Sequence, residues 1–157
     1  MKFKNYWLLY MAMMCVGMGQ TVIFAVMPML GRELGLHLLV FDLPLVGQYQ
    51  PKELMITLLS ALTALTFSLV TPFWGRLSDR VGRKPVIVFG LLGYTVGMLL
   101  FSGTAMLGLL GVISGLGLFG LLVLTRLVHS LVMSAAMPAS NAYIVDITHE
   151  SQRSKGL

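Results

Sequence analysis

The fold is decided by residues 75–85, which read GRLSDRVGRKP and lie between two long apolar runs. Five of these eleven residues are charged. Gly82 permits a positive φ, and hence a tight turn, between Asp79 and Arg83. Because the segment is short, we expect the apolar runs on either side of it to be antiparallel neighbouring helices.

The apolar runs outside this segment have the length of membrane spans. A helix needs about 20 mostly apolar residues to cross a hydrocarbon layer of roughly 30 Å. We therefore predict an all-α polytopic membrane protein with four transmembrane helices, a cytoplasmic loop at residues 75–85 and the start of a fifth helix near Arg153. The predicted spans cover residues 6–30, 54–74, 85–106 and 118–144. The first run is too long for the apolar part of a cleaved signal peptide, so we predict that it stays in the protein.

The composition excludes several classes of protein. Of the 157 residues, 57% are apolar and 11% are charged, whereas a soluble domain has about 25% charged residues. Cys15 is the single cysteine, so neither a disulfide framework nor a cysteine metal site is expected. No motif places a nucleophile beside a base, and no spacing suits metal ligands. We therefore expect no enzyme activity, no cofactor and no metal.

The basic residues indicate how the chain lies in the membrane. If the amino terminus is cytoplasmic, eight of the 11 lysines and arginines fall on the cytoplasmic side, two fall outside and Arg126 lies within a span. This asymmetry follows the positive-inside rule. It also explains the net charge of +5 without nucleic acid as a partner. We predict a multi-pass protein surrounded by lipid in a bacterial-type inner membrane, with a cytoplasmic amino terminus.

Polar residues within the spans are candidates for a substrate or proton pathway. A charge at mid-membrane costs at least about 2.5 kcal/mol, so such residues usually have a function. The candidates are Gln20 on the first span and Arg126, His129 and Asn141 on or beside one face of the fourth. The alternative is that polar residues only bind neighbouring helices together, or that Arg126 reaches the outer headgroups.

Two further patterns are explained by helix packing and by contact with lipid. The spacing of Gly93 and Gly97 predicts close packing of the third helix against a neighbour. The twelve methionines are interpreted as lipid-facing residues.

Residues 75–85 closely resemble the loop signature of the major facilitator superfamily between its second and third helices. The end of the fourth span, AYIVDIT at residues 142–148, resembles helix four of tetracycline and multidrug efflux members. Arg126 is similar to the helix-four arginine of the family, but His129 and Ser130 stand where the family often has Gln and Gly. The signature positions matched here are Gly75, Asp79, Arg80, Gly82, Arg83 and Lys84.

The resemblance implies roles for these residues on the cytoplasmic side. Asp79 would face a helix of a second bundle and hold the two bundles together. Arg83 would pair with an acid near the end of helix four, which here is Asp146. The signature residues and Asp146 are therefore predicted to act in gating.

The resemblance also implies a function for the chain. Family members have about twelve helices in two bundles, so we expect this chain to be an amino-terminal part that needs a carboxy-terminal bundle. The expected function is proton-coupled efflux of small organic molecules, such as drugs or exported metabolites like siderophores. Two alternatives remain open, namely an importer of sugars or organic acids on the same scaffold and a truncated membrane fragment that transports nothing.

Overall fold

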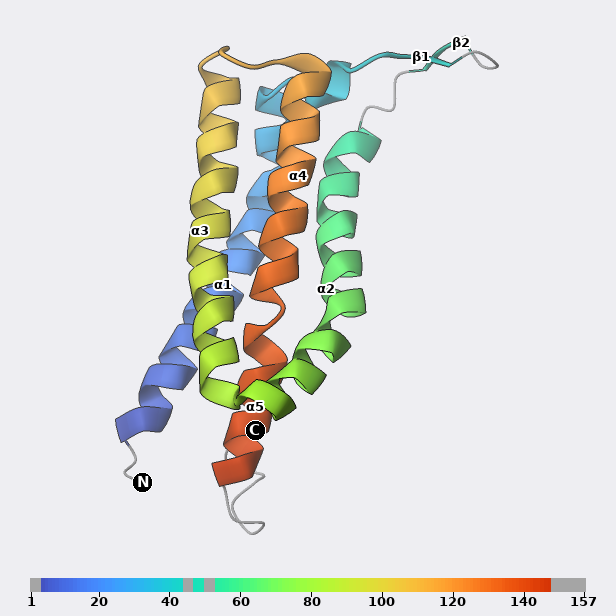
Figure 1. Cartoon of the computed structure of the whole chain (residues 1–157). Helices are drawn as coiled ribbons and strands as arrows, with labels where there is room; N and C mark the ends of the chain where they lie inside the picture. The colour runs from blue at the N-terminus through green and yellow to red at the C-terminus, as the bar shows by residue number, and fades with distance from the viewer. Residues whose placement is uncertain (1–3, 44–46, 50–52, 148–157) are drawn as a thin grey trace.

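The computed structural model describes residues 4–43, 47–49 and 53–147, which form a bundle of long helices (Figure 1). The prediction of an all-α fold is confirmed. In the link between α1 and α2, a short antiparallel hairpin that the sequence did not predict pairs Phe41 with Tyr49. The elements in chain order are α1 (Lys4–Glu33), η1 (Leu36–Leu38), β1 (Phe41–Leu43), β2 (Gly47–Tyr49), α2 (Glu53–Val81), α3 (Arg83–Leu109), α4 (Gly115–Met133) and α5 (Ala136–Ile147).

Four stretches of helix in the described residues are long and apolar enough to cross a membrane, as predicted. They are Trp7–Glu33, Leu54–Val81, Arg83–Leu109 and Gly115–Asp146, the last of which comprises α4 and α5. The start of α1, the turn between α2 and α3 and the end of α5 lie at one end of the bundle, and the hairpin lies at the other (Figure 1). The predicted fifth helix near Arg153 is outside the described residues.

The segment 75–85 is not the loop that the sequence predicted. α2 does not end at Trp74 but continues through Gly75 to Val81, and Gly82 alone separates it from α3. One glycine inside a helix costs only about 1 kcal/mol, so Gly75 does not stop the helix. A Cβ at Gly75 would also meet nothing within 4 Å, so no close helix contact occurs there. The chain reverses at Gly82, which has a φ of 98°.

The fourth span also differs from the prediction. It begins at Gly115 rather than near residue 118, and it is interrupted at Ser134 and Ala135. Pro138 explains the interruption, because a proline inside a helix lacks the N–H that would bind the carbonyl four residues earlier. The other predicted spans are also longer in the structure, since α1 reaches Glu33 and α3 reaches Leu109.

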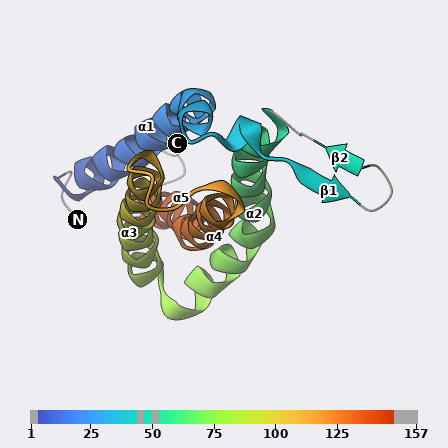
Figure 2. The same ribbon diagram turned by 90° about the horizontal axis from the view of Figure 1, so that it is seen from above.

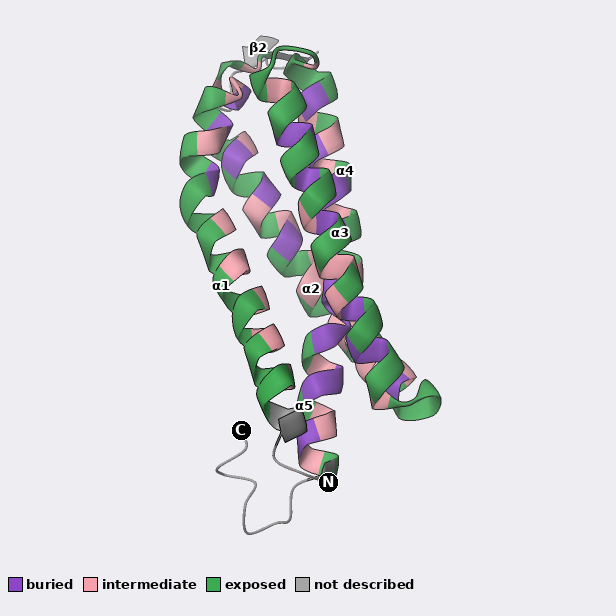
Figure 3. Cartoon of the chain, turned by 90° about the vertical axis from the view of Figure 1, so that its left-hand side faces the viewer, coloured by how far each residue is buried: buried purple, intermediate pink, exposed green. Residues whose placement is uncertain are grey.

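The fourth span lies at the centre of the bundle, between α2 and α3 (Figure 2). α1 packs more loosely, and most of its surface is exposed (Figure 3). The predicted close packing at Gly93 and Gly97 is confirmed, because a Cβ at Gly93 would overlap Val132 and one at Gly97 would lie 2.8 Å from the Cβ of His129. Small residues thus let α3 approach α4 closely.

Apolar side chains form two buried clusters at different heights of the bundle. The cluster nearer the hairpin joins η1 to the four spans and includes Met27, Leu36, Leu59, Phe101 and Leu122. The cluster nearer the α2–α3 turn consists of Val86, Ile87, Ala135 and Ala139, with Trp74 and Tyr143 packed against it.

Candidate functional site: a charged cluster, a buried polar pair and a cavity

Arg83 connects three helices at the end of the bundle that contains the α2–α3 turn. Its Nε donates to Asp146 Oδ2 of α5 at 3.1 Å, and its Nη1 donates to Ser78 Oγ of α2 at 2.7 Å. Nη1 also forms an ion pair with Asp79. The Arg83 side chain is 22% exposed, so the cluster is partly shielded from solvent. The structure therefore brings Arg83 and Asp146 together in the way that the resemblance implies.

The turn at Gly82 makes this cluster possible. The φ and ψ of Gly82 are 98° and 151°, a combination that residues with a Cβ rarely adopt. Because the reversal takes a single residue, Arg83 begins α3 directly beside the last turn of α2. Its guanidinium group can then reach Asp79 and Ser78 as well as α5.

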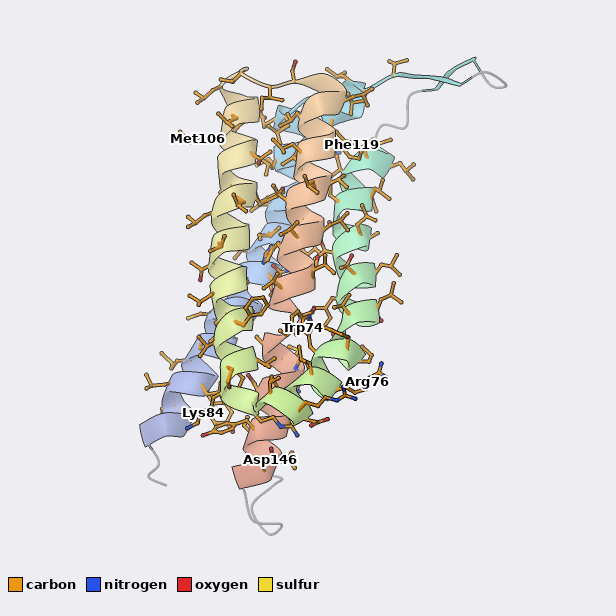
Figure 4. All side chains as sticks on the ribbon, in the orientation of Figure 1. Trp74, Arg76, Lys84, Met106, Phe119 and Asp146 are labelled. Atoms are coloured by element: carbon orange, nitrogen blue, oxygen red, sulfur yellow. The ribbon has the colours of Figure 1, made fainter. Side chains whose placement is uncertain are left out.

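The remaining signature residues lie around this cluster. Arg80 and Asp79 are exposed, and Lys84 Nζ lies 6.0 Å from the centre of the Tyr143 ring. Figure 4 shows Lys84, Arg76 and Asp146 at the same end of the bundle. The role of Asp79 toward a second bundle stays a prediction.

Arg126 is buried at the centre of the bundle. Its relative exposure is 0%, and its Cζ lies 4.8 Å from the centre of the Phe101 ring. None of its three guanidinium nitrogens has a hydrogen-bond partner within the described ranges. The alternative that Arg126 reaches the outer headgroups is therefore wrong, because the guanidinium group is fully covered by protein.

His129 lies one turn further along α4 and packs against α3. Its exposure is 1%, and neither ring nitrogen has a hydrogen-bond partner among the residues that the structure describes. The Tyr94 ring lies 5.4 Å from the imidazole, centre to centre. The sequence analysis missed Tyr94, although its position three residues before Gly97 places it on the helix face that meets α4.

Gln20 lies elsewhere, in a cavity of about 340 Å³ between α1, α2 and the interruption of the fourth span. Its Oε1 is buried and has no hydrogen-bond partner in the described part of the chain. No charged residue lines the cavity. The side chains that line it besides Gln20 include Met13, Met133, Met137, Phe24 and Phe67.

The four predicted pathway residues are thus not in one place. Gln20 lines the cavity, whereas Arg126 and His129 are buried beside α3. Asn141 is exposed on α5 and does not line the cavity. Met11 and Met29 are exposed, whereas Met13, Met133 and Met137 line the cavity, so the interpretation of the methionines as lipid-facing stays a prediction.

Four apolar helical spans with a buried polar interior define a multi-pass membrane protein. The sequence profile of the Major Facilitator Superfamily matches residues 9–157, and the chain belongs to this family of transmembrane transporters.

The names of two curated relatives refer to drug resistance. The chain is 33% identical over 100 residues to "Multidrug resistance protein 2" of Bacillus subtilis, an alignment that covers 63% of this chain and 22% of that protein. It is 25% identical over 152 residues to "Quinolone resistance protein NorA" of Staphylococcus aureus, covering 97% of this chain and 32% of that protein. The chain therefore spans a third or less of the length of these relatives.

Proposed function

We propose that this chain is the amino-terminal part of a proton-coupled efflux transporter for small organic molecules, such as drugs or exported metabolites like siderophores. The observation that carries the proposal is the uncharged cavity between α1, α2 and the fourth span. The names of the relatives support it, since one is a multidrug and another a quinolone resistance protein.

The chemistry of the cavity suits an aromatic or apolar guest. Methionine side chains are flexible and polarisable, so they adapt to guests of different shape. Phe24 and Phe67 offer ring faces for stacking. The free Oε1 of Gln20 would accept a hydrogen bond from an N–H or O–H group of the guest. The volume of about 340 Å³ is at the lower end of the range for small-molecule sites.

Arg126 and His129 are proposed to serve the proton pathway. Ionisable side chains in the interior of a membrane bundle are costly and usually functional. A neutral imidazole can take up a proton at physiological pH and release it again.

Arg83, Asp79 and Asp146 are proposed to act in gating. We place them on the cytoplasmic side of an inner membrane, together with the amino terminus, because the basic residues gather there. A carboxy-terminal bundle would close the open side of the cavity, and alternating access would come from the movement of one bundle against the other. Asp79 is exposed and so is available to such a partner bundle.

The test is norfloxacin uptake by inside-out membrane vesicles that contain the complete product of the gene encoding this chain. Norfloxacin is a quinolone, and its fluorescence reports uptake. We expect uptake when the vesicle lumen is acidic and loss of uptake when nigericin removes the proton gradient. Vesicles without the protein are the control. Uptake that ignores the gradient would contradict proton coupling.

The two alternatives predict different outcomes in the same vesicles. An importer would show saturable transport of a labelled sugar or organic acid, and norfloxacin would not compete for it. A fragment without transport activity would show no gradient-dependent movement of either compound. Either outcome would overturn the proposal of efflux.

A further inference from the structure

The fourth span contains a carbonyl group that lacks its regular backbone donor. In a continuous α-helix, the N–H of Ala135 would bind the carbonyl of Leu131. Here the N–H of Ala135 binds the carbonyl of Val132 instead, at 3.1 Å. Pro138 has no N–H to bind the carbonyl of Ser134, which favours this local departure from regular helix. The Leu131 carbonyl is therefore left without its regular donor.

Two side chains replace the missing donor. The indole Nε1 of Trp74, on α2, donates to the Leu131 carbonyl at 2.7 Å, and the hydroxyl of Ser134 donates to the same oxygen at 2.9 Å. A backbone carbonyl without a partner costs several kcal/mol inside a membrane. Trp74 thus stabilises the interrupted form of the fourth span from a neighbouring helix.

The indole of Trp74 is held in place by aromatic neighbours. The rings of Phe73 and Phe89 each lie 5.4 Å from it, centre to centre. Figure 4 shows Trp74 beside the point where α4 ends and α5 begins. From the side of α3, Gly90 approaches so closely that a Cβ there would lie 2.5 Å from the backbone nitrogen of Ala136. α2 and α3 therefore enclose the interruption between them.

The interruption affects both the cavity and the ion pair between Arg83 and Asp146. Met133 precedes it, Ala136 and Met137 follow it, and all three line the cavity. At the far end of α5, Asp146 meets Arg83. The direction of α5 relative to α4 consequently determines the shape of the cavity and the position of the ion pair.

We propose that Trp74 is a positioning residue for the substrate cavity, which acts by donating its indole hydrogen bond to the Leu131 carbonyl and so keeping the fourth span interrupted. The part of the inference that concerns substrate rests on the proposed function, because it assumes that the cavity binds substrate. Loss of the donor lets the Leu131 carbonyl turn back to Ala135 and α5 turn with it. Met137 then leaves the wall of the cavity.

The first test measures the hydrogen bond itself and needs no transport. In the purified complete gene product with ¹⁵N-labelled tryptophan, the Trp74 indole signal is the one that Trp74→Phe removes. We expect its N–H to exchange slowly with deuterium. Pro138→Ala restores a donor for the Ser134 carbonyl and favours a continuous helix, so it should speed this exchange at least tenfold. Pro28→Ala is the control, since Pro28 lies inside α1 without interrupting it. Unchanged, slow exchange in Pro138→Ala would overturn the inference.

The second test measures transport in the inside-out vesicles. Trp74→Phe keeps an aromatic ring but removes the donor, so we expect the KM for norfloxacin to rise about fivefold with a smaller change in the maximal rate. This is the factor that a net hydrogen-bond contribution of about 1 kcal/mol produces. Trp7→Phe, at a position 68% exposed on α1, is the matched control and should leave the KM unchanged.

The outcomes separate the inference from the proposed function. If the unaltered protein moves no norfloxacin, the proposed function fails, and the deuterium exchange still decides the inference. If the unaltered protein transports norfloxacin and well-folded Trp74→Phe keeps its KM, the inference fails and the proposed function stands. Pro138→Ala should raise the KM in the same direction as Trp74→Phe, and a lowered KM would also contradict the inference.

Discussion

Arg83 Nε lies 3.1 Å from Asp146 Oδ2, which joins the first residue of α3 to the end of α5. Arg83 also has acceptors in Asp79 and Ser78 of α2. Asp146, by contrast, forms its ion pair in the described residues with Arg83. The two members of the pair are therefore not equivalent. Loss of the arginine removes contacts to α2 and α5 together, and loss of Asp146 removes only the contact to α5.

The first prediction concerns this asymmetry. Because the pair is partly exposed, we expect Asp146→Asn to lower the initial rate of norfloxacin transport about twofold. Arg83→Gln should lower it more, and the exchange of the two charges should restore part of the rate. The double-mutant cycle measures the coupling. Arg76→Gln is the control, since Arg76 donates to the Pro72 carbonyl of its own helix. Strictly additive losses would count against the pair.

The second prediction concerns the turn between α2 and α3. Gly82 has a φ of 98° and a ψ of 151°, in a region that essentially only glycine adopts. Gly82→Asn should therefore destabilise the protein by about 1–3 kcal/mol, seen as a lower melting temperature in detergent. Gly35 also has a positive φ, of 69°, but with a ψ of 16° it lies in the left-handed helical region. Asparagine tolerates that region, so Gly35→Asn should have a small effect, and equal effects at both sites would contradict the explanation.

The third prediction concerns Arg126. Arg126 is a buried cation that has no hydrogen-bond acceptor among the described residues, which costs free energy, so Arg126→Met should raise the melting temperature of the complete protein. The same change should abolish transport that depends on the proton gradient. Gain of stability with loss of function is the signature of a residue kept for activity. A lower melting temperature would instead show that Arg126 is structural.

The fourth prediction concerns orientation in the membrane. Val81 and Leu38 are exposed at opposite ends of the bundle, with exposures of 55% and 62%. In a background without other cysteines, a thiol reagent that does not cross membranes should label Leu38→Cys in intact cells. It should label Val81→Cys only after the cells are opened. Labelling of Val81→Cys in intact cells would reverse the predicted topology.

The spans and the Arg83–Asp146 pair could be predicted because they depend on local composition and on a matching pattern of residues. The predicted end of the second span at residue 74 was wrong, because a single glycine such as Gly75 is only a weak helix breaker and α2 continues to Val81. The interruption of the fourth span was missed although Pro138 was a visible signal. The bond from Trp74 to Leu131 joins residues 57 positions apart, and no pattern within either helix indicates it.

The cavity could not be predicted, because its walls come from three spans. Gln20 and Met137 belong to different helices, and their proximity depends on how α1 packs and where the fourth span is interrupted. The sequence places Arg126, His129 and Asn141 close to one face of a single helix. The interruption separates Asn141 from the other two residues, so the regular helical spacing on which that prediction rested no longer holds.

The central claim is that a transporter holds its organic substrate in the cavity between α1, α2 and the fourth span. The most direct measurement is the KM for norfloxacin transport driven by a proton gradient in liposomes that contain the complete gene product. Phe67→Ala removes an aromatic ring from the cavity wall, and Leu99→Ala removes a side chain of α3 that is 69% exposed. We predict a KM raised about tenfold or more for Phe67→Ala, since burial of an aromatic side chain contributes about 1.5–3 kcal/mol, and an unchanged KM for Leu99→Ala. Equal KM values for Phe67→Ala and the unaltered protein, or no gradient-driven transport at all, would contradict the account.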